Sequence, residues 1–69
     1  MNELTLIIRD ISGRRIYRID SWKYYEIVDK LRELGINQDR AYEAGKWSMK
    51  AKPADNLQVG QYRLEIRRN

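Results

Sequence analysis

The sequence predicts a small α+β domain in which two helices cover one face of a three-stranded sheet, in the order ββααβ. Three observations predict it. Three short runs alternate apolar and polar residues, residues 21–36 repeat apolar residues with a helical period, and residues 37–53 begin and end with helix-terminal residues. With 69 residues, we expect residues 1–69 to form a single domain.

The first two runs predict a β-hairpin. Residues 3–9 read ELTLIIR and residues 14–19 read RRIYRI, with Asp10 to Gly13 supplying a turn between them. In the second run, Tyr17 and Ile19 share one face, whereas Ile16 and Arg18 share the other.

Residues 21–36, SWKYYEIVDKLRELGI, predict the first helix. Its core-facing residues recur at helical spacing: Tyr24, Ile27, Val28, Leu31 and Leu34. Asp20 or Ser21 can cap its N-terminus, and Gly35 can end it with Ile36 folded back on Leu31. Glu26 and Lys30 are spaced to form an ion pair on the exposed surface.

Residues 37–52 are compatible with two structures. As a helix, they would be capped by Asn37 and stopped by Pro53, although Gly45 weakens a helix interior unless a neighbour packs against it. As a strand, the segment EAGKWSMK would alternate Gly45, Trp47 and Met49 against Ala44, Lys46, Ser48 and Lys50. We expect a helix over 38–51, because the end signals agree with one another.

The remainder predicts a loop followed by one strand. Residues 53–56 read as loop, Leu57 and Val59 as anchors of that loop, and Gly60 as a turn position. The closing run QYRLEIRR alternates cleanly and predicts a strand. The predicted inner face of the sheet consists of Leu4, Leu6, Ile8, Tyr17, Ile19, Tyr62, Leu64 and Ile66.

Two resemblances bear on these expectations. The segment AYEAGKWSMKAKPADNLQVGQYRLEI resembles the tail of small uncharacterised phage and mobile-element proteins, in which an AYEAGxW helix precedes an LxVGxY turn and a final strand. This resemblance implies a helix at 38–52 and a mobile-element origin, and no assigned activity. The hairpin, the helix and the closing NLQVGQYRLEI also resemble the β-grasp (ubiquitin-like) fold, ββαββ, which a strand at 41–51 would favour. The terminal Gly-Gly of its conjugated members is absent.

The composition argues against catalysis. The chain has no histidine and no cysteine, so the commonest general base, thiol nucleophile and soft metal ligands are missing. We therefore expect no enzyme activity, no cofactor and no metal. The longest apolar run is too short to span a membrane, which favours a cytoplasmic protein. Fourteen basic residues against ten acidic ones give a net charge of +4, which permits an anionic partner.

Two groups of residues are candidates for binding. On the sheet face away from the helices we expect Ile7, Arg9, Ile16, Arg18, Arg63 and Arg67. Four aromatic residues form a candidate rim around a thin core: Trp22, Tyr25, Tyr42 and Trp47. Exposed isoleucines would make the open face a protein interface, including one for self-association, whereas its arginines would bind nucleic acid. The alternative without function is that these arginines only keep an exposed sheet from aggregating, and that the aromatic residues only border the core.

Overall fold

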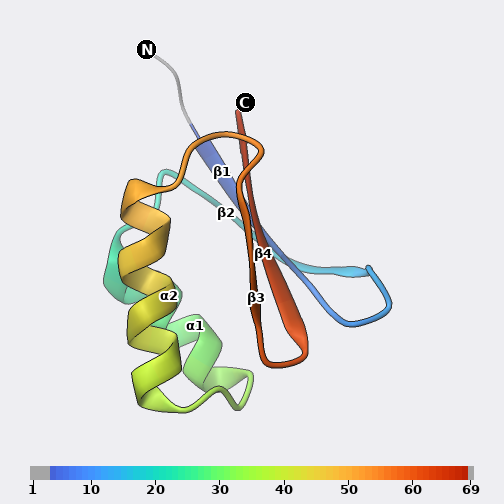
Figure 1. Ribbon diagram of the computed structural model, residues 1–69, viewed down its shortest axis with the longest axis vertical. Coiled ribbons are helices and arrows are strands. Elements are labelled where there is room, and N and C mark those ends of the chain that lie inside the picture. Colours follow the sequence, from blue (N-terminus) through green and yellow to red (C-terminus); the bar gives the residue numbers. More distant parts are fainter. Residues whose placement is uncertain (1–3, 69) are drawn as a thin grey trace.

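A computed structural model describes residues 4–68 as a four-stranded antiparallel sheet with two helices. The sequence predictions that involve residues 1–3 and 69 lie outside this range. In chain order the elements are β1 (Leu4–Arg9), β2 (Arg15–Asp20), α1 (Tyr24–Glu33), α2 (Gln38–Lys50), β3 (Asn56–Val59) and β4 (Tyr62–Arg68). The strands are ordered β2-β1-β4-β3 across the sheet, and both helices lie against one of its faces (Figure 1).

The α+β class is confirmed, but the prediction of three strands in the order ββααβ is wrong. Leu57 and Val59, expected to anchor a loop, belong to β3, which pairs with β4 through four consecutive residue pairs. Gly60, at φ +59°, and Gln61 connect the two strands, so Gly60 holds the turn position expected of it. A two-residue turn that starts with glycine is typical of β-hairpins, and the observed order is therefore ββααββ.

The predicted inner face forms the core. Leu6, Ile8, Leu64 and Ile66 are fully buried, together with Ile27 and Leu31 from α1 and Ala41 and Ala44 from α2. The other four inner-face residues are partly buried and pack against this cluster: Leu4, Tyr17, Ile19 and Tyr62. The core is therefore centred on β1 and β4, the two inner strands.

Helix α1 ends as predicted and begins differently. Gly35 has φ +93°, and the Ile36 N–H donates to the Leu31 carbonyl at 3.0 Å, which completes the expected Schellman ending. The N-cap is Lys23 rather than Asp20 or Ser21, and its N–H donates to the Glu26 carboxylate at 2.8 Å.

Two further predictions for α1 are corrected. Glu26 caps the helix, and Lys30 instead lies 3.6 Å from Glu33 and over the Tyr17 ring, so the pairing of Glu26 with Lys30 is not formed. Tyr24 lies in the first turn at the edge of the layer and is 44% exposed rather than buried in the core.

Residues 38–50 are helical, so the strand alternative for 41–51, on which the ββαββ arrangement depended, is wrong. The Asn37 side chain accepts a hydrogen bond from the Arg40 N–H at 2.9 Å, as its capping role predicts. Gly45 is tolerated because α1 lies directly against it. A Cβ atom at Gly45 would lie 3.0 Å from the Tyr24 carbonyl oxygen and 2.8 Å from Cγ2 of Val28.

We expect Gly45→Ala to destabilise the protein, although alanine favours a helix over glycine by about 1 kcal/mol. The new methyl group would meet the backbone of α1, and overpacking of this kind costs about 1–3 kcal/mol. Since the backbone has little room to yield, we expect the melting temperature to fall by several degrees. Met49→Ala, at a position of the same helix that is 56% exposed, serves as the control and should melt close to wild type. A higher melting temperature for Gly45→Ala would contradict the close packing.

Candidate functional site: the open face of the sheet

The face of the sheet away from the helices carries the arginines that the sequence singles out. Arg9 belongs to β1, Arg18 to β2, and Arg63 and Arg67 to β4. The strand register places Arg9 opposite Arg63, and Arg67 opposite Thr5. Three adjacent strands therefore bring these four arginines onto one surface, which we call the open face.

The expectation that Ile7 is exposed on this face is wrong. Ile7 is only 3% exposed, and Thr5 on the same strand is equally buried. Ile7 lies between Arg18 on β2 and Glu65 on β4, and long side chains can cover an apolar neighbour with their stems. Ile16 is 39% exposed, at a position where the register between β1 and β2 shifts. The open face is therefore more polar than the sequence predicts.

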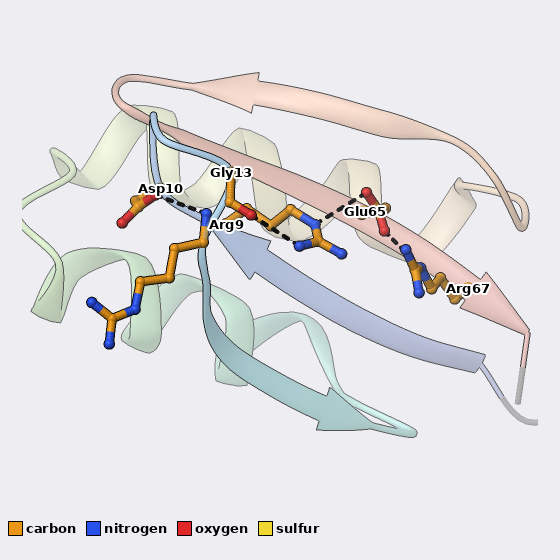
Figure 2. A network of polar contacts seen from close by, with 6 residues as sticks. Arg9, Asp10, Gly13, Glu65 and Arg67 are labelled. Carbon is orange, nitrogen blue, oxygen red and sulfur yellow. Dashed lines mark hydrogen bonds and ion pairs between the residues drawn. The ribbon is translucent and has the colours of Figure 1, made fainter.

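Glu65 connects two of the arginines (Figure 2). Its carboxylate accepts a hydrogen bond from Nε of Arg67 at 2.6 Å and lies 3.5 Å from Nε of Arg9. Arg9 also donates to the Gly13 carbonyl at 3.0 Å, so its side chain spans from the β1–β2 turn to Glu65. Burial by itself raises the pKa of Glu65, but the hydrogen bonds and charges of Arg67 and Arg9 outweigh it and hold the pKa below its ordinary value of 4.5.

Arg18 lies beside a second carboxylate. Its Nε is 3.4 Å from the Asp20 carboxylate, which also accepts a hydrogen bond from the Thr5 hydroxyl at 2.6 Å. Arg9, Arg18 and Arg67 are thus held in place by acidic neighbours. Arg63 differs from them, because within residues 4–68 its side chain makes no hydrogen bond or ion pair.

Arg63 lines a hollow at one end of the open face. The hollow has a volume of about 360 Å³, and its lining includes Arg9, Ser12, Gly13, Gln58 and Arg63. It lies between the β1–β2 turn and the β3–β4 hairpin, so four separate segments converge on it. Two guanidinium groups facing a small hollow form a suitable site for an anionic group.

Asp10 fixes the turn that borders this hollow. Its carboxylate accepts hydrogen bonds from the Ser12 hydroxyl at 2.6 Å, the Ser12 N–H at 2.9 Å and the Arg14 N–H at 3.0 Å. These contacts, the Ser12 hydroxyl first among them, hold the pKa of Asp10 below its ordinary value. The turn exposes Ile11, at 82%, and the following Arg14 and Arg15 are also exposed.

The predicted aromatic rim separates into two groups. Trp22 and Trp47 are partly buried against the core, and the Trp22 indole donates to the Ser48 hydroxyl at 2.9 Å. Tyr25 and Tyr42 are exposed on the helix layer instead, on either side of Tyr24.

Tyr24 meets both other rings edge to face, with centroids 6.2 Å from Tyr25 and 6.1 Å from Tyr42. We call these three residues the tyrosine patch. Sequence reasoning missed Tyr24 as an exposed residue. The sequence signal for its exposure is its position in the first turn of α1, ahead of the part of the helix that covers the sheet.

The strand-containing and helix-containing parts of the chain hold equal numbers of basic residues but differ in net charge and in the type of basic residue. Residues 1–22 and 56–69, which contain the strands, hold seven arginines, four carboxylates and no lysine, a net charge of +3. Residues 23–55, which contain the helices, hold seven basic and six acidic residues, including all five lysines, a net charge of +1. Most of the excess positive charge therefore belongs to the sheet, and arginine alone supplies its basic side chains.

No cluster of acidic side chains within residues 4–68 is arranged to hold a metal ion. Neither α1 nor α2 is long and apolar enough to cross a membrane. Comparison with protein-family models, curated protein sequences and solved structures finds no match for this chain.

Glu65 should make stability depend on acidic pH. Because the pKa of Glu65 is lower in the folded protein, its carboxylate stabilises the fold above pH 4.5, and this contribution is lost as pH falls through the folded pKa. We expect Glu65→Gln to lower the free energy of unfolding at pH 7, by an amount that shrinks steadily below pH 4.5. Urea unfolding between pH 7 and pH 3 measures the difference in the free energy of unfolding between the variant and the wild type. Glu33→Gln, on the exposed surface of α1, is the control. If the free energy of unfolding of Glu65→Gln stayed below that of the wild type by a constant amount down to pH 3, the ion pairs of Glu65 would contribute nothing to stability.

Proposed function

We propose that this chain is a non-enzymatic binding module of the cytoplasm that holds the phosphate backbone of nucleic acid against the open face of its sheet. The observation that carries the proposal is Arg63, a guanidinium without a described partner beside a hollow that Arg9 also lines. The phage or mobile-element origin implied by the C-terminal resemblance belongs to the same proposal, and the genes flanking this one would test it.

The choice of arginine on the open face supports a phosphate ligand. Where charge serves only to protect an exposed sheet, lysine is the usual residue. Arginine instead presents a planar fork of donors that matches phosphate oxygens in pairs. Seven arginines and no lysine in the strand-containing segments are therefore better explained by recognition than by protection alone.

The burial of Ile7 weakens the expectation that the open face is a protein interface. A protein interface through the open face depended on exposed Ile7 and Ile16, and only Ile16 remains exposed, at 39%. The β1–β2 turn adds the exposed Ile11, three residues before Arg14. A polar, arginine-rich surface with one apolar tip suits the sugar–phosphate backbone more closely than it suits an apolar partner surface.

The tyrosine patch favours a second candidate function, protein–protein interaction. Its three rings are each between 44% and 52% exposed, and Met49 on the same layer is 56% exposed. Tyrosine is enriched at the energetic centres of interfaces, because it offers a large contact area at low conformational cost. This surface lies on the helix layer, so it would bind a protein without competing with the open face.

Arg63→Glu should weaken binding to nucleic acid. Each phosphate neutralised on duplex DNA contributes about −0.9 to the slope of log affinity against log salt, through counterion release. We expect the variant to bind a mixed-sequence duplex more weakly, with a slope shallower by about 1. Arg32→Glu on α1 is the matched control, since it changes the net charge equally on the opposite layer. Equal losses in both variants, or no binding by the wild type at low salt, would contradict the proposal.

The second candidate is tested by replacing Tyr25 and Tyr42 with serine, because both side chains are exposed. If the tyrosine patch binds a protein, a partner recovered from the native host with the wild type should be lost with the double variant. Its affinity for the DNA duplex should stay unchanged. A partner retained equally by both proteins would exclude the patch.

A further inference from the structure

The two outer strands of the sheet differ in how their free edges are protected. β2 carries Arg15, Arg18 and Asp20, and the register shift leaves Ile16 as the extra residue of a β-bulge. Charges and bulges are the usual features that prevent an edge strand from pairing with another chain. β3, which reads Asn-Leu-Gln-Val, has no charge, no proline and no register shift against β4.

The free edge of β3 has backbone groups available for a further strand. In an antiparallel pair, alternate residues direct their N–H and C=O groups toward the partner strand or away from it. Val59 and Tyr62 flank the two-residue turn, so their backbone N–H and C=O groups are directed toward each other. Asn56 and Gln58 occupy the alternate positions of β3, and their backbone groups are therefore directed toward the free edge. Beyond β3 the sheet has no further strand within residues 4–68.

A largely apolar groove runs beside this edge. Its volume is about 650 Å³, and its apolar lining consists of Ala44 and Trp47 from α2 and Leu57 and Val59 from β3. Arg40 and Glu43 of α2, Gln58 of β3 and Gly60 of the β3–β4 turn complete the lining. Trp47 and Leu57 are only partly buried. An added strand would form main-chain hydrogen bonds to β3 and place every second side chain toward this groove, as in other cases of strand addition.

We propose that β3 pairs in antiparallel orientation with β3 of a second copy of this chain. A protein with a net charge of +4 repels its own copies, so self-association requires a surface without like charges. β3 is such a surface, whereas pairing of β2 with its copy would bring Arg15 and Arg18 of both chains together. Antiparallel pairing is also compatible with the two-fold symmetry of most homodimers.

The pairing would join two sheets into one sheet of eight strands. On the helix side, Leu57 of each copy would meet an apolar residue of the other copy beside the two grooves. On the open face, Gln58 of one copy would lie opposite or diagonal to Gln58 of the other, because its side chain lies on the same face as that of Arg63. This self-association replaces the one expected through Ile7 and Ile16.

Charge at position 58 provides the test. Like charges placed together at an interface repel each other, so Gln58→Lys and Gln58→Glu should each raise the dimer dissociation constant at least tenfold. An equimolar mixture of the two variants should restore a dimer, because opposite charges would then meet. Gln61→Lys, in the adjacent turn, is the matched control: it changes the net charge equally without touching the edge and should dimerise as the wild type does.

Sedimentation equilibrium without nucleic acid measures the wild type, the three variants and the mixture, so the result does not depend on the proposed function. Circular dichroism confirms that each variant is folded. A wild type that remains monomeric up to about 1 mM, the limit of weak association, would overturn the proposal. The proposal would also be overturned if Gln58→Lys left the dimer intact or if the mixture of the two variants stayed monomeric. It would be overturned as well if Gln61→Lys weakened the dimer as much as Gln58→Lys does.

Discussion

The contact between α1 and α2 at Gly45 is the constraint on which the arrangement of the molecule depends. Without a side chain at this position, the backbone of α1 approaches α2 closely, and two short helices together cover a four-stranded sheet. The Trp22 indole, in the connection between β2 and α1, lies 2.9 Å from the Ser48 hydroxyl of α2, so both polar groups are satisfied. The close approach of the helices also brings Tyr24 beside Tyr42, so the exposed tyrosine patch is a consequence of close helix packing.

The opposite side of the sheet is organised by carboxylates rather than by packing. Glu65 holds Arg9 and Arg67, and Asp20 lies beside Arg18, so acidic residues fix the orientation of the basic ones. Arg63 has no such neighbour among the described residues, which leaves its charge available to a ligand. The open face therefore carries two kinds of arginine: Arg9, Arg18 and Arg67 lie beside carboxylates, whereas Arg63 does not.

Most of the secondary structure follows from local signals, and the errors arise where tertiary context decides. The Asn37 cap, the Gly35 ending and the alternation of Tyr62, Leu64 and Ile66 are local, and each is observed. The sequence analysis misses β3 because its alternation of polar and apolar residues extends over only four positions, although Gly60-Gln61 between Val59 and Tyr62 is a usable hairpin signal. The burial of Ile7 could not be predicted, because it depends on the register that places Arg18 of β2 and Glu65 of β4 on either side of it. The hollow at Arg63 likewise joins segments that only the folded topology brings together.

The segregation of lysine from arginine also determines how the molecule responds to amine chemistry. All five lysines lie between residues 23 and 52, on the helix side, so acetylation or amine-directed labelling of side chains would modify that layer alone. The guanidinium groups of the open face would keep their charge throughout. A sample immobilised through its lysine side chains would consequently present the open face to solution, with the tyrosine patch turned toward the support.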